Sequence, residues 1–215
     1  MLEFLLYAGV LIIIATMLVM HLTLKKLHKP KLSIVPKCTG SFLFVWLVLM
    51  AYVQHGENPF QSLLFWFFVI CTIADGVIGV RFINGMLIFG AAHICLIIWS
   101  LQQAAFSWIS VAVWAAVMIV MYLAFRKLLQ KMGKRGPAFV GYAGILVADF
   151  AVALPLVVTA GPAYILMPIG TLLFLVSDGF IAMELIDRKP WQQYAVMTLY
   201  WGSLYVISLV PWIIL

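Results

Sequence analysis

The stretch FSWISVAVWAAVMIVMYLAF, residues 106–125, carries no charged side chain, and RKLLQKMGKR, residues 126–135, follows it directly. A helix of twenty residues is about 30 Å long, which matches the hydrocarbon core of a bilayer. The five cations that follow are typical of a cytoplasmic loop. Together, the two stretches predict a helix that crosses a membrane and ends on its cytoplasmic side.

Apolar segments of this kind recur along the whole chain. The 215 residues are 66% hydrophobic and 9% charged, which is too little charge for the surface of a soluble domain. We expect an all-α membrane protein with eight transmembrane helices, formed by residues 1–215 as a single integral membrane domain. The expected spans are roughly 3–24, 38–54, 60–80, 82–101, 106–126, 137–158, 162–185 and 192–214.

The cations predict the orientation of these spans. All thirteen fall in the loops after the first, third, fifth and seventh spans: Lys25, Lys26, Lys29, Lys31, Lys37, Arg81, Arg126, Lys127, Lys131, Lys134, Arg135, Arg188 and Lys189. This asymmetry predicts a multi-pass protein with both termini on the non-cytoplasmic side. The short loops favour a cell inner membrane as its location. The net charge of +6 then reflects the orientation of the spans in the lipid membrane. We expect no nucleic-acid partner, because the sequence has no nucleic-acid motif.

Three aspartates lie inside the predicted spans, where a centred carboxylate opposes insertion by about 2.5–3.5 kcal/mol. Asp75 in TIADGVIGV (72–80) and Asp178 in LFLVSDGFIAM (173–183) share a small residue before them, Gly after them and a small residue four positions on. The match hints at a parallel four-plus-four repeat, in which Asp149 has no counterpart. A structural role, with the carboxylate bonded to a neighbouring hydroxyl or amide, stays open for each of the three.

The matched pair indicates acid–base chemistry. Asp75 lies six residues before Arg81 and Asp178 six before Glu184, so both are expected about 9 Å below the cytoplasmic edge, at the depth of a lipid's glycerol backbone. Two carboxyl groups that share a chamber of low dielectric cannot both ionise easily, so one acid and one carboxylate coexist, as in glycosidases. This reading requires that both side chains face one lipid-accessible chamber.

The predicted spans hold one further ionisable group of interest, a histidine. His93 is the one histidine near the middle of a span, and it could bond substrate, bond an aspartate or make an interhelical contact. A single histidine cannot build a three-histidine zinc site, and the three cysteines show no pairing pattern, so no metal is expected.

At these residues the chain resembles the YhhN family of eight-span membrane proteins, whose members include lysoplasmalogenases. The resemblance rests on several features of the sequence. They are Asp75, the pattern Phe82-x-x-Gly85-x-x-x-Phe89-x-x-x-His93, the segment Leu173 to Asp178 followed by Ile181-Ala182, and the positions of Lys37, Thr198 and Tyr200. The chain departs from the family at three places. Cys38 stands in place of a proline, the glutamine expected near Ser203 is missing, and Asp149 has no counterpart in the family.

The resemblance implies hydrolysis of the vinyl ether bond of a lysoplasmalogen, a lysophospholipid taken from the cytoplasmic leaflet. Asp75 and Asp178 would be the catalytic pair, with the acid and the base unassigned, and His93, Lys37 and Tyr200 would support or bind substrate. This chemistry requires no cofactor. Two alternatives stay open: a proton-coupled lipid or solute transporter that uses the same aspartates, and a lipid-binding protein without catalysis.

Overall fold

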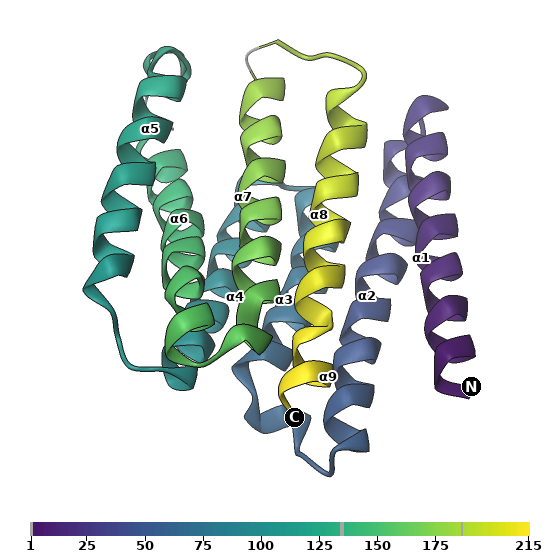
Figure 1. The fold of residues 1–215 in the computed structure, drawn as a ribbon. Helices are drawn as coiled ribbons and strands as arrows, with labels where there is room; N and C mark the ends of the chain where they lie inside the picture. Colours follow the sequence, from purple (N-terminus) through teal and green to yellow (C-terminus); the bar gives the residue numbers. More distant parts are fainter. Residues whose placement is uncertain (1, 134–135, 186) are drawn as a thin grey trace.

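The computed structural model describes residues 2–133, 136–185 and 187–215, and in this part every regular element is helical. Lys134 and Arg135, counted above among the cations, lie outside the described residues. The long helices form an upright array (Figure 1). The elements are α1 Leu2–Lys26, α2 Pro30–Gln54, η1 Pro59–Gln61, α3 Leu63–Ile78, α4 Phe82–Gln103, α5 Trp108–Met132, α6 Gly136–Thr159, η3 Pro162–Ile165, α7 Leu166–Glu184, α8 Gln192–Ser208 and α9 Val210–Ile214.

Seven segments of the described chain are long and apolar enough to cross a membrane. They support the expected all-helical membrane protein. The remaining predicted span, 60–80, corresponds to α3, which has 16 residues and reaches about 24 Å, so its crossing stays a prediction. The last predicted span, 192–214, is divided between α8 and α9, where Pro211 cannot donate a backbone hydrogen bond.

The start of α2 corrects the sequence-based boundary of the second span. The helix begins at Pro30, eight residues before the expected 38, so Lys31 and Lys37 belong to a helix and not to a loop. Proline fits the first helical turn, where the missing N–H has no intrahelical partner. Pro36 also lies inside α2, so the expected start of the second span at residue 38 is wrong.

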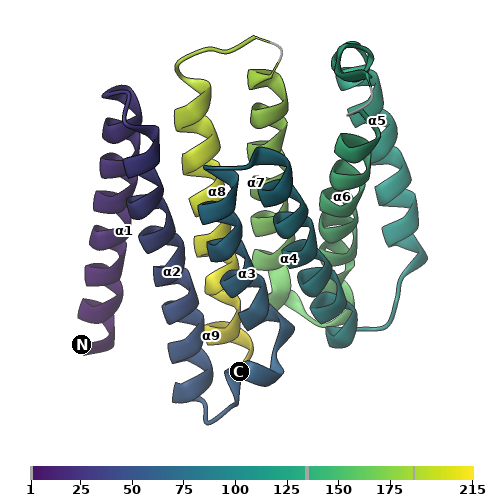
Figure 2. The same cartoon turned by 180° about the vertical axis from the view of Figure 1, so that it is seen from behind.

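Neighbouring helices pack in pairs, α1 with α2, α3 with α4, α5 with α6 and α7 with α8. Figure 2 shows α3 and α4 on one face of the array, in front of α7 and α8. Close contacts between α2 and α8 are made possible by Gly40, because a Cβ at this position would stand 2.2 Å from the Trp201 ring. The shared core of these helices carries the candidate site.

The connection between α3 and α4 lies nearer the middle of the array than the α5–α6 and α7–α8 connections do (Figures 1 and 2). The turn is tight: a Cβ at Gly85 would come within 2.4 Å of the Ile78 Cα. Because Arg81 follows this recessed turn, it does not mark the same level as Glu184. The equal depths inferred for Asp75 and Asp178 from these two markers are therefore not supported.

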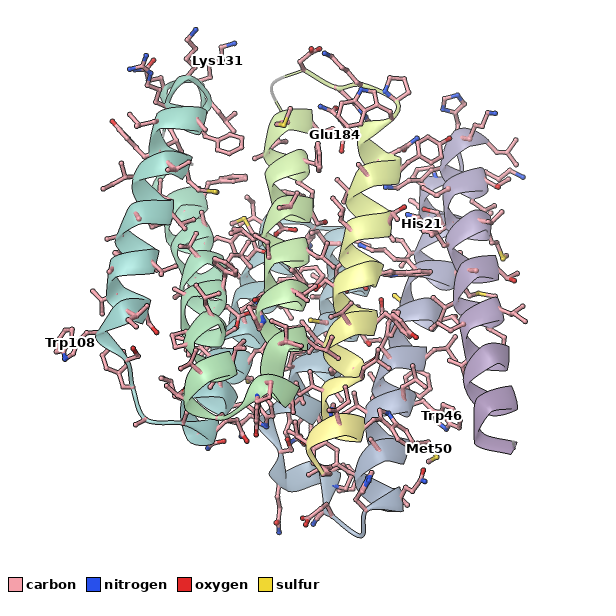
Figure 3. All side chains as sticks on the ribbon, viewed as in Figure 1. His21, Trp46, Met50, Trp108, Lys131 and Glu184 are labelled. Atoms are coloured by element: carbon pink, nitrogen blue, oxygen red, sulfur yellow. The ribbon has the colours of Figure 1, made fainter. Side chains whose placement is uncertain are left out.

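The charged side chains separate the two ends of the array. In Figure 3, Lys131 and Glu184 lie at one end and Trp108 lies toward the other. We call the end with Lys131 the basic end, because α1 and α5 finish there with Lys25, Lys26 and Lys131. The start of α1 and the end of α9 both lie at the opposite end (Figure 1). Which end faces the cytoplasm, and whether the halves are repeats, stay predictions.

Candidate functional site

Asp75 lies at the centre of a buried polar cluster made by three helices. Its carboxylate is 0% exposed, and Oδ1 is 2.8 Å from the Lys37 Nζ of α2. The Tyr200 hydroxyl of α8 donates to Oδ2 at 2.7 Å, and the Ser41 hydroxyl of α2 donates to the same oxygen. Both carboxylate oxygens therefore have partners, as a buried charge requires. We call these four residues the Asp75 cluster.

Local structure explains how the cluster is held. Lys37 and Ser41 are four residues apart on α2, so both side chains project from one helix face toward α3. The Lys37 Nζ also lies 5.4 Å from the centre of the Tyr200 ring, within reach of a cation–π contact. That ring is held edge-on by Phe89 and Phe174, at centroid distances of 5.7 and 5.3 Å.

A cavity of about 170 Å³ adjoins this cluster. Its walls come from α3, α4, α5, α6, α7 and α8, with Lys37 of α2 at one side. Most of the lining is apolar, from aromatic rings, methionines and aliphatic side chains. The polar residues among the lining are Lys37, Tyr122, Tyr142, Ser177, Asp178 and Tyr200.

Asp178 faces this cavity and is only partly buried. Its Oδ2 accepts a hydrogen bond of 2.5 Å from the Tyr142 hydroxyl of α6. The neighbouring Ser177 points elsewhere, since its hydroxyl donates to the Val196 carbonyl at 3.0 Å. Asp178 is therefore a carboxyl group with one fixed partner and direct access to an apolar space.

The two predicted catalytic aspartates occupy different positions relative to the cavity. Asp178 lines it, whereas Asp75 is not among the described lining residues and lies behind Lys37 and Tyr200, which do line it. The sequence-based reading requires both side chains to face one chamber, and for this cavity only Asp178 meets that requirement. Asp75 contacts Lys37 and Tyr200, which line the cavity, and does not line it itself.

His93 and Asp149 form a second buried pair. The His93 Nδ1 donates to the Asp149 Oδ2 at 2.7 Å, and the two side chains are 1% and 0% exposed. Phe67 and Phe174 pack edge-on against the imidazole, with centroids 5.5 and 4.2 Å away. Because Phe174 lines the cavity, His93 lies behind that wall. The structure thus gives His93 an aspartate partner, and that partner is neither Asp75 nor Asp178.

Two residues of the site escaped the sequence reasoning. Ser41 carries a weak signal, since it lies one helical turn after Lys37, but a serine in a membrane helix commonly bonds its own backbone. Tyr142 carries none, because tyrosines near span ends are typical of the membrane interface. Among the described residues, no group of three or more His, Cys, Asp or Glu side chains is arranged to hold a metal ion.

Comparison with known proteins agrees with the motifs. The model of the YhhN family matches residues 32–210, which include all four members of the Asp75 cluster and both partners of each other pair described above. Neither the curated proteins nor the solved structures contain a match to the chain. A family match over this share of the sequence shows membership: the chain belongs to the YhhN family.

Proposed function

We propose that this protein is a membrane hydrolase that cleaves the vinyl ether bond of lysoplasmalogens, giving a fatty aldehyde and a glycerophospho-base. Membership of the YhhN family is consistent with a lysoplasmalogenase-type function. The observation that carries the proposal is Asp178, a carboxyl group at the wall of an apolar cavity, with Tyr142 fixing one of its oxygens. This arrangement suits the protonation of a carbon–carbon double bond, which needs an acid in contact with an apolar substrate.

The proposed reaction begins with a proton transfer from Asp178 to the double-bond carbon farther from the ether oxygen. This transfer leaves an oxocarbenium ion, and the Asp178 carboxylate stabilises its charge. A water molecule then adds to the cationic carbon and returns a proton to Asp178. The resulting hemiacetal breaks its bond to the glycerol oxygen, which leaves as a hydroxyl, and the alkyl chain leaves as an aldehyde. Atoms and charge balance without a metal or an organic cofactor.

The Asp75 cluster supports this chemistry from behind the wall. Lys37 presents an ammonium group with three donors, of which the one toward Asp75 is 2.8 Å from its acceptor. The other donors are available to the phosphate of a lysophospholipid, because Lys37 also lines the cavity. Asp75 is then a positioning residue that holds Lys37 and Tyr200 in place. This role refines the sequence-based view of Asp75 as one of two groups in contact with the substrate.

The proposal includes the arrangement in the membrane. We assign eight crossings, with α3 as a short one, and place the basic end at the cytoplasmic face of an inner membrane because cations favour that side. The cavity lining includes Leu128 and Leu129, which lie in the last turns of α5 near the basic end. A lysophospholipid of the cytoplasmic leaflet would therefore reach the cavity without crossing the bilayer.

The test uses the purified protein in detergent with lysoplasmenylethanolamine, and measures aldehyde release. Asp178→Asn removes the proton donor and should lower the rate by about 100-fold or more. Tyr142→Phe keeps the ring and loses the hydrogen bond, so a smaller loss of about 10-fold is expected, with folding checked by thermal unfolding. Wild-type activity in Asp178→Asn would disprove the catalytic role. Flux into proteoliposomes that depends on pH, without product, would favour a transporter.

A further inference from the structure

The cavity has two chemically different walls. On one side lie the polar groups of α2, α6, α7 and α8 described above. On the other side α5 contributes only one hydroxyl, that of Tyr122, and otherwise apolar side chains over three helical turns: Met118, Met121, Phe125, Leu128 and Leu129. A wall of this kind suits a hydrocarbon chain, and its methionines adapt easily to the shape of a ligand.

Helix α5 stands apart from the other helices that share the cavity. It packs along α6, whereas the cavity separates it from α7, which lines the same space with Leu175, Gly179 and Ile181. A Cβ built at Gly179 meets no atom within 4 Å, so the space beside this part of α7 is open. Figure 1 shows α5 and α7 flanking α6. The open space therefore lies between α5 and α7.

The same region is open to the outside of the protein. Tyr122 lines the cavity and is nevertheless 61% exposed, and Val140 of α6 lines it and is 40% exposed. In a membrane, the outside at this place is the acyl chains of the bilayer. A hydrocarbon chain could thus move from the bilayer into the cavity with no contact with water, and so with no cost of hydrating its methylene groups.

We propose that the opening beside Tyr122, between α5 and α7, is the lateral portal through which the single alkyl chain of a lysophospholipid enters from the bilayer and binds along α5. The identity of the lipid rests on the proposed function. The polar wall opposite α5 then lies beside the glycerol end of the lipid, where Asp178 and Lys37 are found. Met121 and Gly179 mark the two sides of the portal.

A non-cleavable probe tests the portal without relying on catalysis. The protein is placed in phospholipid bilayer discs with an alkyl-ether lysophospholipid that carries a photoreactive diazirine on its chain. Illumination followed by peptide mass spectrometry should find adducts concentrated in residues 118–129 of α5 and in 175–182 of α7. Excess unlabelled alkyl-ether lysophospholipid should remove them. Adducts spread evenly over lipid-facing helices such as α1, or unaffected by the competitor, would overturn the proposal.

Matched variants sharpen the test. Met121→Trp and Gly179→Leu each place bulk in the portal and should lower probe labelling by about 10-fold. Leu123→Trp is the control, because Leu123 lies two residues from Met121, is 57% exposed and is not among the described lining residues. It should label like the wild type. Equal labelling of Met121→Trp and Leu123→Trp would overturn the portal.

Failure of the portal and failure of the proposed function give different results. The probe has no vinyl ether, so its labelling does not depend on turnover. Labelling as expected without aldehyde release from any lysoplasmalogen would leave the portal and reject the hydrolase. Aldehyde release with labelling that ignores Met121→Trp would leave the hydrolase and reject the portal.

Discussion

The buried His93–Asp149 pair allows a quantitative prediction about stability. His93→Phe keeps a ring between Phe67 and Phe174 but removes the donor that lies 2.7 Å from the Asp149 Oδ2. The Asp149 Oδ1 has no described hydrogen-bond partner, so the variant leaves a wholly buried carboxyl group without any described partner. Breaking a buried pair in this way costs about 3–5 kcal/mol in unfolding free energy. Asp149→Leu leaves the imidazole without its carboxylate partner and removes the carboxyl group itself, so about 1–3 kcal/mol is expected.

The double variant His93→Phe/Asp149→Leu decides the interpretation. It removes both polar groups and keeps similar volumes, so it should be more stable than His93→Phe alone. The assay is reversible unfolding of the purified protein in mixed micelles, with the four proteins compared as a double-mutant cycle. If the double variant loses as much as the two single variants together, the two side chains do not stabilise each other, and the reasoning fails.

Two glycines give further predictions about packing. Gly40→Ala should lower the melting temperature in detergent and destabilise by about 1–3 kcal/mol, because its Cβ would stand 2.2 Å from the buried Trp201 ring. Gly85→Ala should be at least as harmful, since the obstacle is the Ile78 Cα, and a backbone atom cannot move aside as a side chain can. Gly202→Ala is the control in thermal unfolding: a Cβ there meets nothing within 4 Å, and the melting temperature should stay equal or rise. A melting temperature for Gly40→Ala or Gly85→Ala that matches this control would contradict the close packing.

The fold was predictable to the level of its helices. Hydrocarbon thickness and the need to satisfy backbone groups within each segment leave few alternatives for an apolar run of this length. The boundaries of the helices were harder to predict from the sequence. Lys31 and Lys37 are typical of a loop and favour a late start for α2, yet Lys37 can lie within that helix because Asp75 offsets its charge. A partner on another helix is tertiary information, which the local sequence does not carry.

The candidate site was predictable in its residue types more than in its pairings. Asp75 and Asp178 share a sequence pattern, but the first is enclosed by Lys37 and its other partners and the second faces a cavity. Which hydroxyl meets each carboxylate depends on how the helices are rotated against one another, as the contact from Tyr142 to Asp178 illustrates. Only an assembled bundle fixes that rotation.

The ion pair between Lys37 and Asp75 has a consequence for how the chain is built. The two residues lie on α2 and α3, which are consecutive long helices, so the newly made hairpin can place both in the bilayer with their charges cancelled. Either one alone would oppose insertion by about 2.5–3.5 kcal/mol. Tyr200 is 125 residues further along than Asp75, so its hydroxyl arrives only when α8 has been synthesised. Early translation products thus carry a charge-neutral but unfinished centre, and the last long helix completes it.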